Sequence, residues 1–234
     1  MQLFYTPLIQ TDNYTLDEQE SKHCVKVLRM KEGDILHLTD GSGNIFMAEI
    51  TLANPKACSL KIIERNPDFE KRPFYLHIAI APTKNIDRFE WFLEKATEIG
   101  IDEITPLITE NSERKQVNHE RLERIIISAM KQSIKAYKPK INELQTFDKF
   151  TNSYDGKTAA FIAHCYEEEK QDLKTAYKKN TDALILIGPE GDFSPEEVKT
   201  AIEKKLTPVS LGQSRLRTET AGVVACHTLN LINS

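Results

Sequence analysis

The stretch Gly188-Pro189-Glu190-Gly191-Asp192-Phe193-Ser194 follows an uninterrupted apolar run, Ala183–Ile187. Such a run is typical of a strand that is buried on both faces of a parallel sheet. The serine that ends the stretch and Glu197 have the spacing of a capping box, with a proline at the first helical position, so a helix is predicted over Ser194–Lys205. The stretch is therefore predicted to be a strand-to-helix loop of an α/β domain, where ligands bind at the carboxyl ends of the strands.

A second loop of the same kind follows about twenty residues later. The sequence Leu211-Gly212-Gln213-Ser214-Arg215-Leu216-Arg217-Thr218-Glu219-Thr220-Ala221 comes after a short strand and opens a largely apolar helix. Taken singly, each loop is equally consistent with a plain strand-to-helix turn, which needs glycine in any case. Together, and with polar residues opening the last helix, they predict a ligand pocket with two sides.

The acidic residues of the first loop indicate the kind of ligand. Glu190 and Asp192 would repel a phosphate, and the chain has neither a Walker sequence nor a GxGxxG sequence. A nucleoside without phosphates fits these charges better. S-adenosylmethionine is such a ligand, and it carries a sulfonium cation as well.

Strands and helices alternate through the C-terminal two-thirds of the chain, which predicts an α/β domain with a mostly parallel sheet. The expected strands are Tyr75–Ala81, Ile104–Ile108, Thr158–His164 and Pro208–Leu211, and the expected helices are Ile86–Ile99, His119–Tyr137 and Thr218–Leu231.

The first part of the chain is predicted to be a small β-barrel. Asp34–Leu38 and Ile45–Ile50 have the pattern of a hairpin around Asp40–Asn44, and Ala57–Ile63 is a further alternating run. The charged segment Asn66–Pro73, which has two prolines, is the expected linker. The predicted domains are therefore residues 1–70 and 71–234.

Composition limits the classes of function. A net charge of −4 argues against a protein that coats nucleic acid indiscriminately. Residues 111–140 nevertheless hold eight Lys or Arg against three Glu, either as a solvated helix face or as an RNA-facing patch. No apolar run approaches the ~18–20 residues that span a bilayer, and the first residues do not resemble a signal peptide, so a cytoplasmic protein is expected. The scattered histidines and cysteines predict no metal site and no disulfide framework.

The two loops carry a resemblance to a known family. The sequence resembles the RsmE family, bacterial methyltransferases of the SPOUT class that methylate N3 of a uridine in small-subunit (16S) ribosomal RNA. The family pattern is Gly-Pro-Glu-Gly-Gly-Phe-Ser and then Leu-Gly-x-Arg-Ile-Leu-Arg-Thr-Glu-Thr-Ala, and further matches extend over nearly the whole chain. Three places depart from it: Asp192 replaces the second glycine, Ser214-Arg215 replaces Arg-Ile, and Lys135 replaces an arginine.

The resemblance implies a fold that periodicity does not predict. The C-terminal domain is expected to be a SPOUT-type parallel-sheet domain whose chain forms a trefoil knot, an exception among protein folds. A small PUA-like β-barrel that binds RNA is expected to precede it. The family also implies a homodimer, with ribosomal RNA or the small ribosomal subunit as partner and S-adenosylmethionine as cofactor.

Residues are assigned to roles on this basis. Arg217 is a candidate for stabilising the oxyanion that develops on the uracil, and Glu219 is a candidate base or orienting group. The plainer readings are a structural tie for the arginine and a favourable charge at a helix N-terminus for the glutamate. The donor is expected to bind at Ile187, Gly188, Glu190, Gly191, Leu211, Gly212, Leu216, Thr218 and Ala221. RNA is expected to bind at Lys22, Lys26, Arg29, Lys84 and Arg88.

Three other functions are weighed against this one. The first is a methyltransferase of the same class that acts on another RNA base, because the loops mark a donor site and not the acceptor. The second is a non-catalytic RNA-binding dimer, which the retained run Arg217–Thr220 disfavours. The third is an enzyme that uses nucleotide phosphates, which the acidic first loop disfavours.

Overall fold

The computed structural model describes every residue except 1, 8, 10, 168 and 169. Its contacts divide the chain into two compact units. The first unit holds residues 1–71 together with 127–138, and the second holds residues 72–126 together with 139–234. The division falls inside helix α3 (His119–Gln132), so the first unit contains a segment that chain order alone does not assign to it.

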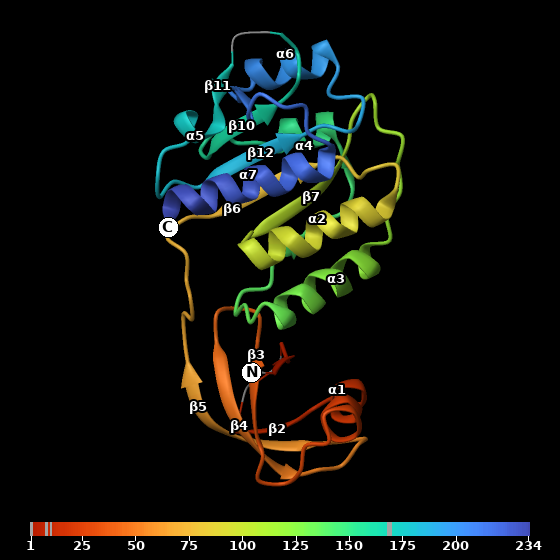
Figure 1. Cartoon of the computed structure of the whole chain (residues 1–234), viewed down its shortest axis with the longest axis vertical. Helices are drawn as coiled ribbons and strands as arrows, with labels where there is room; N and C mark the ends of the chain where they lie inside the picture. Colours follow the sequence, from red (N-terminus) through yellow and green to blue (C-terminus); the bar gives the residue numbers. More distant parts are fainter. Residues whose placement is uncertain (1, 8, 10, 168–169) are drawn as a thin grey trace. The chain divides into compact units, whose positions relative to one another are not determined.

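The second unit is built on a parallel sheet, as expected (Figure 1). Its strand order is β11-β13-β10-β12-β6-β7-β8, and a short β9 pairs with β7. All of these strand pairs are parallel in the described part of the chain. All five residues of β12, at the centre, are buried. The bounds are β6 (Leu76–Ile80), β7 (Glu103–Ile108), β8 (Lys140–Ile141), β9 (Gln145–Thr146), β10 (Ala159–Ala163), β11 (Gln171–Asp172), β12 (Ala183–Ile187) and β13 (Thr207–Ser210).

Helices cover both faces of this sheet. Alternate residues of β12 point to opposite faces, so Ile185 packs in the cluster that contains Phe89 and Ala225, while Leu186 packs in the cluster that contains Val198. The first cluster lies under α2 (Ile86–Ile99), the first part of α3, α5 (Leu173–Ala176) and α7 (Thr218–Asn233). The second lies under α4 (Phe147–Ser153) and α6 (Pro195–Glu203).

The chain therefore changes face between α6 and α7, and it does so through the loop 211–217. The trefoil knot that the resemblance implies stays a prediction. Within the part of the chain that is described, no helix has the length and apolar character needed to cross a bilayer.

Sequence pattern and structure agree closely for α2 and β12, which occupy the predicted residues. The capping box of α6 is also confirmed, because the Ser194 hydroxyl accepts from the Glu197 amide and the Glu197 carboxylate accepts from the Ser194 amide. The predicted C-terminal end of α3 was wrong. The helix ends at Gln132 and not at Tyr137, because Ile134 adopts a left-handed conformation with φ 57°.

The first unit is a curled five-stranded sheet with the order β1-β3-β4-β5-β2 (Figure 1). The predicted hairpin joins β3 to β4, and its turn is held by Asp40, whose carboxylate accepts from the amides of Ser42 and Asn44. The bounds are β1 (Leu3–Tyr5), β2 (Asn13–Thr15), β3 (Ile35–Thr39), β4 (Ile45–Leu52) and β5 (Ser59–Asn66), with helix α1 (Glu18–Lys22) and a π-helical segment (His23–Val27) between β2 and β3.

The segment 127–138 is bound to this small sheet by polar contacts. The hydroxyl of Thr39 and the amide of Gly43 both donate to the carbonyl of Ala136, at 3.1 and 3.0 Å. The Lys131 ammonium lies 2.6 Å from the carboxylate of Glu20. These contacts explain why α3 ends early, since the chain must leave the helix to reach the sheet.

Candidate functional site

A cavity of about 870 Å³ lies at the carboxyl ends of β10, β12 and β13. Three loops line it, one after each of these strands, so the pocket has a third side that the sequence did not predict. The residues predicted to bind the donor all line this cavity: Ile187, Gly188, Glu190, Gly191, Leu211, Gly212, Leu216, Thr218 and Ala221.

Glycine occupies these positions of the two loops for different physical reasons. A Cβ on Gly188 would lie 3.0 Å from the amide nitrogen of Phe193, and a Cβ on Gly191 would lie 3.1 Å from the Cβ of Asn111, so a side chain at either position would require its neighbour to shift by a few tenths of an ångström. Gly212 is different, because a Cβ there would meet nothing within 4 Å, but its φ is +123°. The backbone conformation therefore requires glycine at 212.

Neighbouring loops hold the first glycine loop in place. The side-chain amide of Asn111 donates to the carbonyls of Gly191 and Asp192, at 3.2 and 3.1 Å. The Glu190 carboxylate accepts from the backbone amide of Lys84 at 3.0 Å. Since residues 84 and 111 follow β6 and β7, the shape of the donor loop depends on the adjacent strands of the sheet.

The cavity lining carries both signs of charge. The acidic residues Glu167, Glu190 and Asp192 are matched by the basic residues Lys170, Arg215 and Arg217. The acids of the first loop, which were expected to repel a phosphate, are therefore balanced by bases elsewhere in the lining. Its apolar walls come from Ala163, Ile187, Val209, Leu211, Leu216 and Ala221.

The charged and apolar groups that line the cavity fit S-adenosylmethionine, which combines an adenine ring, a sulfonium cation and a zwitterionic amino-acid group. An apolar slot with side chains of both charges beside it suits such a ligand better than it suits a polyphosphate.

The two candidate catalytic residues lie in different surroundings. Arg217 is exposed and lines the cavity. Glu219 is not among the lining residues, and its side chain is only 9% exposed. Its Oε1 lies 3.9 Å from Nε of Arg88, and its Oε2 has no hydrogen-bond partner among the described residues. Glu219 therefore faces α2 and not the donor cavity.

The predicted RNA-binding residues belong to both units. Lys22, Lys26 and Arg29 are exposed on the first unit, and no ion pair is formed by them within the described chain. On the second unit, the Lys84 ammonium lies 2.7 Å from the Glu113 carboxylate, and Arg88 is the residue beside Glu219.

Five of the eight basic residues in the stretch 111–140 are held by contacts within their own unit. The guanidinium of Arg114 donates to the carbonyls of Thr83 and Lys84. Four further residues form ion pairs: Arg121 with Glu90, Lys131 with Glu20, Lys135 with Glu70 and Lys140 with Glu103. Half of the basic residues of this stretch are therefore engaged in ion pairs within their own unit.

Sequence reasoning missed the third side of the cavity, formed after β10 by His164, Cys165, Tyr166, Glu167 and Lys170. The Tyr166 hydroxyl donates to the carbonyl of Phe193 at 2.7 Å, and the Lys170 ammonium donates to the carbonyls of His164 and Tyr166. No glycine marks this loop in the sequence, and its charged run at residues 167–170 also suits a plain solvated loop. It reaches the cavity because β10 lies between β12 and β13.

Comparison with known proteins identifies the family. A family model for an RNA methyltransferase domain matches residues 70–230, and a model for an RNA methyltransferase PUA domain matches residues 16–63. Ribosomal RNA small subunit methyltransferase E of Synechocystis is 32% identical over 93% of this chain and 73% of that protein. The protein of the same name from Rickettsia conorii is 30% identical over 97% of this chain and 93% of that protein.

Solved structures agree with this result. The "probable rRNA-methyltransferase" of Porphyromonas gingivalis is 45% identical, with a TM-score of 0.91 and 99% of each chain covered. A protein of Legionella pneumophila, solved with bound S-adenosylmethionine, is 28% identical, with a TM-score of 0.86 and 99% of this chain and 97% of that chain covered. The chain therefore belongs to the RsmE family, the ribosomal RNA small subunit methyltransferases E.

Proposed function

We propose that this protein transfers the methyl group of S-adenosylmethionine to N3 of a uridine in small-subunit ribosomal RNA. The observation that carries the proposal is the single cavity that gathers every predicted donor-binding residue at the carboxyl ends of three parallel strands. Two relatives at least 30% identical are named for the small ribosomal subunit RNA, and a structural relative holds S-adenosylmethionine.

The donor, when bound, supplies an electrophilic methyl group on its sulfonium. The work of the chain is to orient this donor and to exclude water, which makes the transfer effectively intramolecular. Ile187, Leu211 and Leu216 provide apolar surface for the nucleoside. The glycine loops let their backbone approach the ligand closely, and the contacts of Asn111 and Glu190 keep the first loop in shape before the donor arrives.

The acceptor requires help because the N3–H group of uridine is a weak acid and a poor nucleophile while it is protonated. As the proton leaves, negative charge develops on O2 and O4 of the ring. Arg217 is the proposed stabilising group, since it lines the cavity and its guanidinium keeps its charge. For Glu219 the burial and the nearby Arg88 support an orienting role rather than the role of general base.

The RNA is proposed to contact Lys22, Lys26 and Arg29 on the first unit and Lys84 and Arg88 on the second. Their exposure supports this for Lys22, Lys26, Arg29 and Lys84. A homodimer in the cytoplasm, without a metal cofactor, completes the proposal. The oligomeric state can be measured by light scattering during size-exclusion chromatography.

The test combines donor binding with mapped methyl transfer. Calorimetry should show binding of S-adenosylmethionine to the wild-type protein. Small subunits or their RNA, taken from a strain that lacks its own enzyme, should gain one methyl group at N3 of a uridine. A methyl group on another base would replace the proposed target, and RNA binding without any donor binding would establish a non-catalytic protein.

A further inference from the structure

Asp192 stands where the resembling family has a second glycine, and the structure gives its side chain specific contacts. Its backbone is left-handed, with φ 63°, and it lines the donor cavity. Oδ2 accepts a hydrogen bond from the backbone amide of Cys165 at 2.7 Å, and Oδ1 accepts from the amide of Phe193 at 2.8 Å. The carboxylate thus links the loop after β12 to the loop after β10.

The link joins two walls of the same cavity. Strands β10 and β12 are paired in register up to Ala163 and Ile187, so their loops leave the sheet side by side. Cys165 and Tyr166 form the wall after β10, and a second bond, from the Tyr166 hydroxyl to the Phe193 carbonyl, runs in parallel to that of Asp192. Aspartate tolerates the left-handed conformation better than most residues, and two charge-assisted hydrogen bonds offset its strain.

We propose that Asp192 is a positioning residue for the donor cavity, because its carboxylate fastens the loop 164–167 to the loop 188–192. The wall formed by Cys165 and Tyr166 is then in place before the donor binds. Glycine at position 192 has no side chain to make this link. The inference rests on the proposed function for one element, the identity of the ligand as S-adenosylmethionine.

The first measurement is donor affinity in Asp192→Gly. Glycine keeps the backbone conformation and removes the link, so the wall is ordered for only part of the time and the apparent affinity falls by that fraction. We expect the Kd and KM for S-adenosylmethionine to rise on the order of tenfold, while kcat changes less than about twofold. Asp192→Asn keeps one acceptor oxygen, so its affinity should be intermediate.

A matched control separates the link from the relief of backbone strain. Lys205 is also left-handed, with φ 67°, but it is exposed at the end of α6 and does not line the cavity. Lys205→Gly therefore removes a similar strain and should leave both the donor affinity and kcat unchanged.

A second measurement is independent of the donor. Cys165 is exposed, whereas the other three cysteines, Cys24, Cys58 and Cys226, are buried, so alkylation reports on one thiol. Burial raises the pKa of Cys165, the charge of Asp192 raises it further, and the charges of Arg215 and Lys170 oppose this effect. In both Asp192→Gly and Asp192→Asn the pH profile of alkylation should move to lower pH, because both variants remove the charge of Asp192, and in Lys205→Gly it should not move. Asn keeps an acceptor oxygen for the Cys165 amide and Gly does not, so only Asp192→Gly should also alkylate faster at an equal fraction of thiolate.

The outcomes are distinct for the two proposals. If Asp192→Gly binds the donor as the wild type does and its Cys165 thiolate is alkylated no faster than that of Asp192→Asn, the positioning role is wrong and the proposed function stands. If the wild-type protein binds no S-adenosylmethionine, the proposed function is wrong, and the alkylation rates of Asp192→Gly and Asp192→Asn still decide whether Asp192 holds the loop. A tenfold loss of affinity together with faster alkylation of the thiolate in Asp192→Gly supports the positioning role.

Discussion

The carboxylate of Glu219 lies 3.9 Å from Nε of Arg88 and is buried, whereas Arg217, two residues earlier, lines the donor cavity. Glu219→Gln keeps the shape of the side chain and removes its charge. We expect kcat to fall at least about tenfold and the Kd for S-adenosylmethionine to change less than about twofold, because only the orientation of Arg88 is disturbed. Steady-state kinetics and calorimetry test this, and equal losses in both quantities would place Glu219 at the donor.

A side chain at Gly212 is expected to abolish donor binding. Valine there would be strained at φ +123° and would add bulk to the cavity lining, so donor binding should be lost. Gly156 is a matched control, since its φ is +73°, a Cβ there meets nothing within 4 Å, and it does not line the cavity. Calorimetry on both variants separates the two effects. Similar donor affinities in Gly212→Val and Gly156→Val would contradict the assigned site.

His77 should make the second unit sensitive to acid. Burial lowers the pKa of His77 from 6.5 to about 4. The charge of Glu103 raises this pKa, and the charge of Lys140 lowers it further. The folded state thus binds fewer protons than the unfolded chain. The contribution of His77 is complete above pH 6.5 and is lost as the pH falls toward 4, by at most about 3 kcal/mol.

The variant that tests this is His77→Gln, which keeps a hydrogen-bonding group near the hydroxyl of Thr105, 2.7 Å from the imidazole Nε2. Urea unfolding at several pH values between 6.5 and 4 should give a flatter stability curve for the variant than for the wild type. Parallel curves would show that His77 does not carry the pH dependence.

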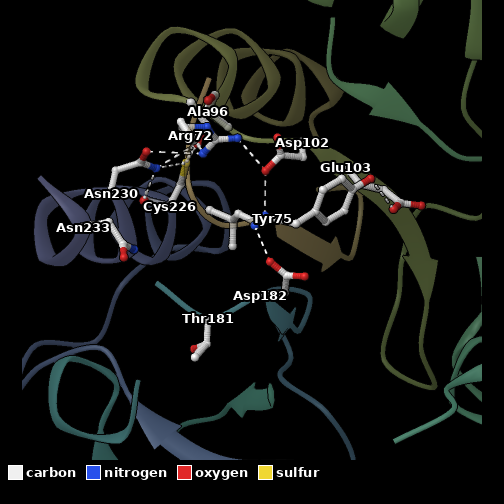
Figure 2. Close-up of polar contacts among 12 residues, drawn as sticks. Arg72, Tyr75, Ala96, Asp102, Glu103, Thr181, Asp182, Cys226, Asn230 and Asn233 are labelled. Carbon is white, nitrogen blue, oxygen red and sulfur yellow. Dashed lines mark hydrogen bonds and ion pairs between the residues drawn. The ribbon is translucent and has the colours of Figure 1, made fainter. Parts of the chain in front are cut away.

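Arg72 and Asp102 form a partly buried ion pair at the opposite end of the sheet from the donor cavity, and breaking such a pair is costly. The guanidinium lies 2.5 Å from the carboxylate, the two side chains are 22% and 20% exposed, and Arg72 also donates to the carbonyl of Gly100 (Figure 2). The Asn230 amide donates to the same carbonyl, which connects the network to α7.

Arg72→Ala should therefore lower the free energy of unfolding by about 2 to 3 kcal/mol, because it leaves the Asp102 carboxylate half-buried without its cation. Lys71→Ala is the control, since its ion pair with Asp68 is exposed, and its urea midpoint should match that of the wild type. Equal midpoints for Arg72→Ala and Lys71→Ala would be incompatible with this role.

RNA binding should depend on salt through the exposed lysines of the first unit. Replacing Lys22 and Lys26 with glutamine should weaken binding and reduce the slope of log K against log salt by about 0.7 to 0.9 for each phosphate contact that is lost. Lys157 is the control, because it is paired with Asp155 in the second unit. Fluorescence anisotropy over a salt series measures the slopes, and an unchanged slope in the double variant would exclude these two contacts.

Local sequence predicted those elements whose ends are set by their own residues. Helix α2 begins after Asn85, whose side chain accepts from the amide of Asp87, and it ends at Gly100, so its bounds were predicted correctly. The end of α3 was not predictable, because Ile134 leaves the helix to let Ala136 meet Thr39, almost a hundred residues away in the chain. The short strands and helices at the edges were missed for the same reason, since their pairing partners and not their own patterns define them.

The sequence by itself determined where the ligand cavity opens, because glycine loops that follow buried parallel strands lie at one edge of a sheet. Only the tertiary structure decided what closes the cavity. Strand β10 lies between β12 and β13, which brings Cys165 within reach of Asp192, and chain order does not specify that neighbourhood. The proposed role of Asp192 therefore depends on the hydrogen bond from the Cys165 amide, which joins loops that follow two neighbouring strands.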